Sequence, residues 1–337
     1  MNSLVITTIA SPNKCLKSIA KNIKDKFRLI IIGDKKSPKK FKLQNSDYYS
    51  LKDQLKIDLK TSRLSKINHY SRKNIGYLIA FKEKSEFIYE TDDDNFPYKE
   101  FYKLKNLFVD GYETENKKFI NIYKYFSNQI IWPRGYPLNY IKTKYQETKK
   151  LNYKKNIYSP VQQYLADGEP DVDAIFRLVF DSKDFKKSKN IYFLKKKTYC
   201  PFNSQNTVWH RSIFPLMYLP VTCSFRLTDI YRSYITQRIL FENNAVISFH
   251  SATVKQIRNA HNLIQDFSHE IDGYTKIEEF LKIIDKIKLK KGKKRIISNL
   301  KKIYNTLIIK KFFHKKEENY LNYWIEDIKK IDKNMNF

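Results

Sequence analysis

The sequence predicts an α/β protein in which a mostly parallel sheet is flanked by helices. Three observations lead to this class: short apolar runs that end at turn residues, helix-compatible segments between those runs, and a lysine-rich helical pattern toward the C-terminus. A chain of 337 residues with 42% apolar residues is long enough for one large or two ordinary domains. We expect one main domain over residues 1–275 and a helical basic C-terminal extension over residues 276–337.

The first two strands are predicted from apolar runs that stop at turn residues. Residues 4–9 form a β-rich run that ends at Ser11 and Pro12, and the stretch after it is compatible with a helix. Residues 27–32 are apolar apart from Arg28 and close at Gly33, which is typical of a parallel strand buried on both faces. The N-terminus is therefore expected to form a β-α-β unit.

The rest of the chain changes character twice. Residues 51–82 carry helical signals, and residues 87–89 form a short strand that runs into three aspartates. Between about 120 and 250 prolines and polar loops dominate, and such loops usually form binding surfaces on a rigid scaffold. From about residue 254 onward the pattern is helical.

The net charge of +30 is concentrated near the C-terminus, with fourteen Lys or Arg and one acid between Lys282 and Lys316. This tail fits docking on an anionic membrane surface, where lipid-linked acceptors reside. It equally fits helices whose apolar face packs on the main domain while the lysines are solvated. No recognised nucleic-acid-binding module is present, so nucleic acid is not an expected partner.

Cysteine usage and hydropathy bear on the compartment. Three cysteines without metal-like spacing argue against a disulfide framework and against a zinc site. No apolar run approaches the ~18–20 residues of a membrane span, and the first 30 residues lack a signal-peptide pattern. We expect a cytoplasmic protein. The alternative is a cytoplasmic protein that contacts the membrane surface through its basic C-terminal helices.

Asp92, Asp93 and Asp94 directly follow the predicted strand at residues 87–89. Adjacent carboxylates repel one another, so this position calls for a compensating cation. Mn²⁺ or Mg²⁺ supplies that charge and bridges carboxylates to a diphosphate. In an extended segment residues i and i+2 point the same way, so Asp92 and Asp94 are the candidate metal ligands. The alternative is a solvated acidic turn, but the end of a strand in an α/β sheet favours a ligand site.

Seven segments, the aspartates among them, occur in an order that resembles a known family. They are GDKKSP (33–38), RKNIGYL (72–78), DDD (92–94), IWPRGYP (131–137), GEPDVDAIFRL (168–178), PFNSQNT (201–207) and FRLTDIYR (225–232). Together they resemble the STELLO family, and the strand that ends in Asp-x-Asp resembles the GT-A fold of nucleotide-sugar glycosyltransferases. The resemblance covers roughly residues 1–275 and does not extend to the tail beyond about residue 280.

The resemblance implies a nucleotide over the carboxyl edges of the first strands. Thr7 and Thr8 would then lie beside the base and ribose, and Asp34 would accept hydrogen bonds from them. Asp34 is alternatively an ordinary turn residue. We assign Asp92 and Asp93 to the same nucleotide site because the metal would bridge them to the diphosphate.

Arg72, Lys73 and Asn74 open a predicted helix ahead of the aspartates. A helix N-terminus with two cations and an amide suits a diphosphate, so we assign all three to nucleotide binding. Solvated surface charge is the alternative. Gly76, inside that helix, indicates a close approach by the nucleotide or by a strand.

Two loop motifs supply further candidates. Trp132 stands near Arg134 in a turn; the tryptophan is expected to be a buried anchor, and Arg134 is expected to be a catalytic residue that contacts the sugar or acceptor. Asp171 and Asp173 could form a second acidic pair or cap the helix that begins near Ala174. Both alternatives remain open.

Inverting GT-A enzymes need a general base close to the acceptor hydroxyl, and the resemblance to the GT-A fold makes Asp229 the candidate for that role. Arg226 and Arg232 flank it in the sequence and would keep it ionised, which lowers its basicity, so a salt-bridged structural role is the alternative. Several GT-A enzymes use a late histidine as a metal ligand, and we assign His250 to that role beside a structural alternative. His261 is a lesser candidate.

We therefore predict a metal-dependent glycosyltransferase that uses a nucleotide-diphosphate sugar, with a UDP-sugar favoured, and a glycan or lipid-linked acceptor. Two alternatives come from the resemblance. One is a non-catalytic assembly partner, because the STELLO family is also linked to cellulose-synthase assembly. The other is a nucleotide-sugar mutase of the reversibly glycosylated polypeptide type, which also carries three aspartates after a similar strand.

Overall fold

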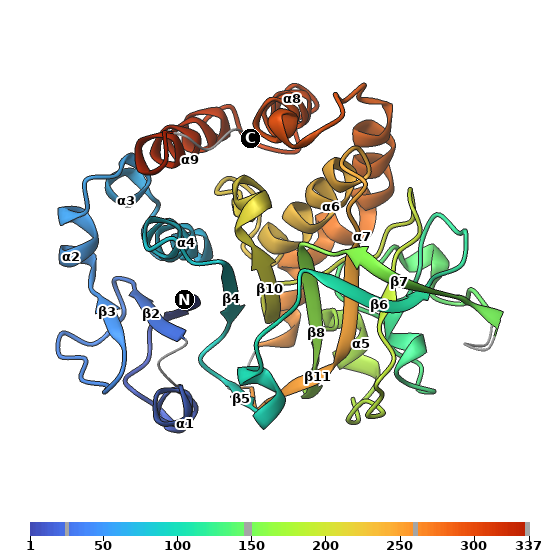
Figure 1. Cartoon of the computed structure of the whole chain (residues 1–337), viewed down its shortest axis with the longest axis horizontal. Coiled ribbons are helices and arrows are strands. Elements are labelled where there is room, and N and C mark those ends of the chain that lie inside the picture. The colour runs from blue at the N-terminus through green and yellow to red at the C-terminus, as the bar shows by residue number, and fades with distance from the viewer. Residues whose placement is uncertain (24–26, 145–149, 259–261, 334–337) are drawn as a thin grey trace.

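A computed structural model of the chain describes residues 1–23, 27–144, 150–258 and 262–333. Within these residues one sheet of eleven strands runs through the molecule, with helices packed on its faces (Figure 1). Ten of the strands follow the order β3-β2-β1-β4-β10-β8-β11-β9-β6-β7, and β5 pairs with β11 beside that path. The α/β class predicted from the sequence is confirmed.

The N-terminal third of the sheet is parallel. Val5 lies opposite Ile30 in the register, and successive side chains of each strand point to opposite faces. Val5 and Ile30 belong to one buried cluster, and Leu4 and Leu29 belong to the other. This two-sided burial explains why these strands are continuously apolar. The strands are β1 (Asn2–Thr8), β2 (Phe27–Gly33), β3 (Asp47–Tyr49) and β4 (Phe87–Thr91).

The remaining strands are mixed in direction. β10 is antiparallel to both β4 and β8, β8 is parallel to β11, and β9 is parallel to β6. The mostly parallel sheet expected from the sequence therefore holds for the N-terminal strands, and the rest is partly antiparallel. These strands are β5 (Asn95–Pro97), β6 (Phe108–Glu113), β7 (Asn152–Tyr158), β8 (Val161–Gly168), β9 (Tyr192–Phe193), β10 (Asn206–His210) and β11 (Ile247–Gln256).

Helices cover the two faces unequally. The larger cluster joins one sheet face to α4 and to the C-terminal helices, whereas α1 and the 3₁₀ turn at Lys99–Tyr102 cover the other face. The helices are α1 (Lys14–Asn22), α2 (Leu51–Lys56), α3 (Lys60–Leu64), α4 (Lys73–Lys82), α5 (Ala174–Val179), α6 (Thr228–Leu240), α7 (Leu263–Lys286), α8 (Ile296–Ile309) and α9 (Glu317–Ile331).

The basic C-terminal extension is integrated into this core. α7 continues across residue 275, and α8 packs on α6 and α7 through its apolar side. α9 returns to the N-terminal region beside α3 (Figure 1), where the Asp327 carboxylate accepts hydrogen bonds from the backbone N–H groups of Lys60 and Thr61. The apolar face of the tail is thus used for internal packing, as one of the two sequence interpretations held.

Gly76 is required by the approach of a strand. A Cβ atom at this position of α4 would lie 2.4 Å from Val5 Cγ1 and 3.0 Å from Ile32 Cγ1. Of the two explanations offered for this glycine, close helix–sheet packing is therefore the correct one. Among the described residues no helix has the length and apolar character that crossing a membrane requires.

Candidate active site

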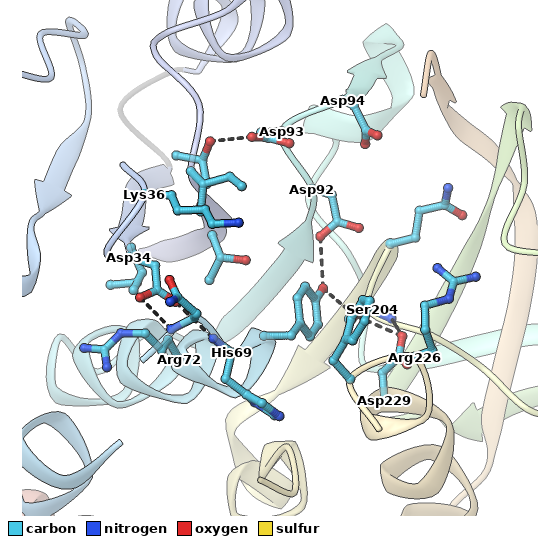
Figure 2. A pocket seen from close by; sticks show the side chains of 18 of the residues that line it. Asp34, Lys36, His69, Arg72, Asp92, Asp93, Asp94, Ser204, Arg226 and Asp229 are labelled. Atoms are coloured by element: carbon cyan, nitrogen blue, oxygen red, sulfur yellow. Dashed lines mark hydrogen bonds between the residues drawn. The ribbon is translucent and has the colours of Figure 1, made fainter. Parts of the chain in front are cut away.

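A cavity of about 510 Å³ opens at the carboxyl ends of β1, β2 and β4. Figure 2 shows it with Asp34 and Arg72 toward one end and Arg226 and Asp229 toward the other, the three aspartates lying between and above. Its walls include nine of the twelve residues assigned from the sequence: Thr7, Thr8, Asp34, Arg72, Asp92, Asp93, Asp94, Arg134 and Asp229. The position agrees with the rule that open α/β sheets bind ligands at strand carboxyl ends.

Each of the three aspartates has a different partner. Asp92 Oδ1 accepts hydrogen bonds from the Tyr70 hydroxyl and from Lys73 Nζ, both at 3.0 Å. Asp93 Oδ2 accepts a hydrogen bond from the Thr8 hydroxyl. Both oxygens of Asp94 lie about 3 Å from Gln256 Nε2, at 3.1 and 3.0 Å. Lys73 is thus the cation in direct contact with this set of carboxylates.

One lysine does not compensate three neighbouring carboxylates. Burial and the charge of Asp92 raise the pKa of Asp94 to about 7, and burial also raises the pKa of Asp93. Within the described residues, Asp92 Oδ2 accepts no hydrogen bond. Carboxylate oxygens are the ligands that Mg²⁺ and Mn²⁺ prefer, so the donor set and its excess negative charge fit a divalent cation. No group of three or more His, Cys, Asp or Glu in the described ranges is already gathered around a metal-sized position.

Lys73 and Asn74 differ from their assigned roles in nucleotide binding. The Lys73 side chain is fully buried and does not line the cavity; its ammonium also donates to the Thr91 carbonyl at 2.8 Å. It therefore orients Asp92 from behind. The Asn74 side chain exchanges two hydrogen bonds with the backbone of Leu219, each 2.9 Å long. We correct both assignments: neither side chain faces the cavity.

At the other end of the cavity, Asp34 organises a loop. Its carboxylate accepts hydrogen bonds from the backbone N–H groups of Asn68 and His69, at 2.9 and 3.1 Å. Arg72 is held by Gln54 Oε1 and by the Ser65 carbonyl, and burial lowers the pKa of its guanidinium. Arg72 lines the cavity whereas Lys73 does not, so the two cations do not face the cavity together.

Arg134 joins two buried carboxylates. Its Nε and Nη2 donate to Asp171 at 2.8 and 2.9 Å, and Nη2 also lies 3.0 Å from Asp229 Oδ2. Asp229 Oδ2 further accepts from the backbone N–H and the hydroxyl of Ser204, both at 3.1 Å. The guanidinium holds the pKa of Asp171 below its usual range, and the two carboxylates hold the pKa of Arg134 well above its own. Arg134 and Ser204 together surround the Asp229 carboxylate with donors, which favours the salt-bridged role for Asp229.

The arginines next to Asp229 in the sequence point elsewhere. Arg226 Nε donates to Glu270 Oε1 at 2.8 Å. Arg232 Nη2 donates to the fully buried Glu90 at 2.7 Å. Neither of them pairs directly with Asp229, whose ion-pair partner is Arg134 from a distant loop.

Of the two roles left open for Asp171 and Asp173, the helix cap holds for Asp173 alone, and each carboxylate has its own partner. Asp171 binds Arg134, whereas Asp173 caps α5 by accepting the Phe176 N–H at 2.8 Å. Asp173 also accepts the indole N–H of Trp132 at 2.6 Å. Trp132 is buried with its ring edge-on to Phe176, as expected for a loop anchor.

His250 lies outside the cavity. It is on β11, stacked on Tyr164 at 4.4 Å between ring centroids, and its Nε2 lies 2.8 Å from the Ser248 hydroxyl. Burial lowers the pKa of His250 to about 3, so it is a neutral core residue. We correct its assignment as a metal ligand accordingly. His261 lies outside the described residues.

Sequence reasoning missed several wall residues. Tyr70 bonds to Asp92 and to Ser204, and Gln256 bonds to Asp94 and to Arg258. Ser204 lies in one of the segments that carry the family resemblance, so the sequence could have identified it as a candidate. Tyr70, Gln256 and Arg258 lie in none of those segments.

The fold and the site together define an α/β protein, consistent with the GT-A type, that carries an acidic cavity at the ends of its parallel strands. The model of the family described as STELLO glycosyltransferases matches residues 226–336. Two proteins of Arabidopsis thaliana are similar to the chain: "Probable glycosyltransferase STELLO1", 28% identical over 74% of this chain and 34% of that protein, and "Probable glycosyltransferase STELLO2", 24% identical over 96% and 44%. The chain is thus similar to STELLO glycosyltransferases, by the family model over residues 226–336 and by two relatives that are less than 30% identical to it.

Two facts qualify the extent of the match. The family model reaches the basic tail, which the sequence motifs alone had left uncovered, so that expectation is corrected. The chain spans less than half of the length of the curated relatives that it matches.

Proposed function

We propose that the chain is a metal-dependent glycosyltransferase that transfers a sugar from a nucleotide-diphosphate donor, with a UDP-sugar favoured. The observation that carries the proposal is the undercompensated set of Asp92, Asp93 and Asp94 in the wall of the cavity. A divalent cation and a diphosphate are the partners that such a set would recruit. The names of the two curated relatives support the same reaction class.

The size and the layout of the cavity support a nucleotide-sugar. Its volume of about 510 Å³ lies in the range of ordinary small-ligand sites, which is ~300–1,000 Å³. Thr7 and the loop ordered by Asp34 would contact the nucleoside, and Arg134 with its two carboxylates would lie at the sugar end. Between them, Asp92 and Asp94 would hold Mn²⁺ or Mg²⁺.

The bound cation would neutralise the charge that develops on the leaving diphosphate. Lys73 and Tyr70 hold Asp92 Oδ1, which leaves Oδ2 for a ligand in the cavity. Gln256 fixes the Asp94 carboxylate from the other side. Arg134 and Ser204 immobilise Asp229, so these residues form a rigid floor for the sugar.

The experiment is hydrolysis and transfer measured over a panel of nucleotide sugars, with and without Mn²⁺. Metal-dependent release of UDP, lost in Asp94→Asn and retained in the surface variant Asp58→Asn, is the expected result. If UDP with Mn²⁺ neither shifts the melting temperature nor is released from any donor, the chain is a non-catalytic assembly partner. Conversion of the donor to an isomer, without transfer, would identify a mutase.

We propose further that the acceptor of the sugar is a glycan or a lipid-linked molecule. Because the apolar side of α8 is buried, membrane contact would depend on exposed lysines such as Lys301 and Lys310. Co-sedimentation with vesicles that contain about 30% anionic lipid should then fall with salt, as electrostatic attachment requires. If the protein does not bind these vesicles at low salt, the proposed membrane contact is wrong.

A further inference from the structure

Arg258 stands apart from the other cations of the cavity wall. Arg134 and Arg226 each donate to a buried carboxylate, at 2.8 Å in both cases. Among the described residues the Arg258 guanidinium makes one hydrogen bond, from Nη2 to Gln256 Oε1 at 2.9 Å. Its Nε is buried without a hydrogen-bond partner, 3.6 Å from the half-exposed carboxylate of Glu169. The Arg258 side chain is only 10% exposed. Burying a guanidinium with so few acceptors costs folding free energy unless a ligand supplies the missing hydrogen bonds.

Further arginines crowd the same region. Arg177 lies behind Arg258, and its Nη2 is also buried without a partner. Burial and the charges of Arg258 and Arg226 lower the pKa of Arg177 to about 10. Burial likewise lowers the pKa of Arg258. Within the described part of the chain, Arg258 Nε and Arg177 Nη2 are thus both buried without a hydrogen-bond acceptor, and an anion in the cavity beside Arg258 would supply one.

Gln256 fixes the distance between Arg258 and the metal-binding aspartates. Its Nε2 donates to Asp94 while its Oε1 accepts from Arg258 and, at 2.6 Å, from Gln205. One amide thus connects the candidate diphosphate site to the arginine. Arg258 lines the same cavity and is linked to Asp94 through Gln256, so a donor whose diphosphate lies at Asp94 would place its sugar within reach of Arg258.

We infer that Arg258 is a specificity residue that recognises the carboxylate of an acidic donor sugar, so that the preferred donor is a nucleotide-linked uronic acid. The inference rests on the proposed function and adds the chemical class of the sugar. A guanidinium matches a carboxylate with two parallel hydrogen bonds, and Arg258 has an unused Nε for that purpose. The diphosphate has other partners in the aspartate-bound metal, which leaves this arginine for the sugar.

The test is calorimetric binding of UDP, UDP-glucose and UDP-glucuronic acid to the full chain in the presence of Mn²⁺. The wild-type protein should bind UDP-glucuronic acid at least about tenfold more tightly than UDP-glucose, since hydrogen bonds to charged groups contribute about this much or more. Arg258→Gln should remove that preference and leave the affinity for UDP unchanged, and Arg258→Lys should restore part of the preference. Arg63→Gln, which removes an exposed arginine, is the matched control.

Three results would overturn the inference. Equal binding of the two sugar nucleotides by the wild-type protein requires no variant and contradicts it directly. Equal weakening of UDP and UDP-glucuronic acid in Arg258→Gln would assign the arginine to the diphosphate. Failure of all three nucleotides to bind would remove the proposed function as well, whereas tight binding of UDP without a preference removes the inference alone.

Discussion

Two acidic groups line the same cavity, and they are built in opposite ways. Asp171 and Asp229 share a buried guanidinium, Arg134, and the pKa of Asp171 is lowered. Asp92 and Asp94 belong to a triplet in direct contact with one ammonium, and the pKa of Asp94 is raised to about 7. In the first group a buried cation binds both carboxylates, whereas in the second group one ammonium faces three carboxylates. Residue type alone therefore does not identify a metal site; the local balance of charge does.

The largest expected effect comes from removing a carboxylate of the second group. Asp94→Asn should reduce metal-dependent donor turnover by about 10²–10³-fold or more, because the cation that stabilises the leaving diphosphate loses a ligand. The fold should persist, since the substitution is isosteric and removes repulsion. Turnover is measured at saturating Mn²⁺ with Asp58→Asn as control, and full activity of Asp94→Asn would contradict the site assignment.

Removing the cation that Asp171 and Asp229 share should instead lower the free energy of unfolding. Arg134→Met leaves Asp171 and Asp229 buried without their cation, which costs about 3–5 kcal/mol of the free energy of unfolding. Urea denaturation measures this loss. Arg63→Met breaks an exposed ion pair and should cost less than about 1 kcal/mol. If the two losses were equal, the two acidic groups would not differ in the way described.

The pH dependence of metal binding sharpens the same comparison. In the folded protein, burial and the charge of Asp92 raise the pKa of Asp94 to about 7, above the usual value of a carboxyl group. Because the folded pKa is the higher one, the stability that this group contributes is fully present below its unfolded pKa and is lost as the pH rises through ~7. Mn²⁺ requires the deprotonated carboxylate, so it should raise the melting temperature more at pH ~8 than at pH ~5.5.

The variant Asp94→Asn serves as the control for that titration. It should melt higher than the wild-type protein at pH ~8 without metal, because a repelled charge is removed, and its response to Mn²⁺ should be small at both pH values. A metal response in the wild-type protein that does not change between the two pH values would show that Asp94 is not a ligand.

The smallest expected effect distinguishes Asp171 from Asp173. Asp173→Ala removes the N-cap of α5 and the partner of the Trp132 indole, and it should cost about 1–2 kcal/mol of the free energy of unfolding. Donor turnover should stay near the wild-type value, because the side chain does not line the cavity. Thermal melts and turnover of the same preparation test this, and lost turnover in a folded variant would contradict it.

The sequence allowed the parallel strands and the position of the aspartates to be predicted, because both are local patterns. Residues 29–32 are apolar at every position, as two-sided burial demands, and the aspartates follow β4 directly. The antiparallel insertion of β10 beside β4 was not predictable in this way. It depends on pairing between Asn206 and Thr91, which no local pattern records.

The partners of the site residues were predicted less well for the same reason. Arg134 reaches Asp229 across 95 positions of the chain, whereas the neighbours in the sequence, Arg226 and Arg232, turn to other acids. Lys73 was assigned to nucleotide binding with solvated surface charge as the alternative, but its burial behind Asp92 became visible only in three dimensions. Gln256 carried no sequence signal although it holds Asp94.

The most direct test of the account is a crystal structure grown with Mn²⁺ and UDP, in which anomalous scattering locates the metal. We predict a manganese peak about 2–2.6 Å from carboxylate oxygens of Asp92 and Asp94, bridged to the diphosphate. Clear UDP density without a metal at these oxygens, or a manganese peak elsewhere in the chain, would contradict the claim that this acidic group exists to hold a cation.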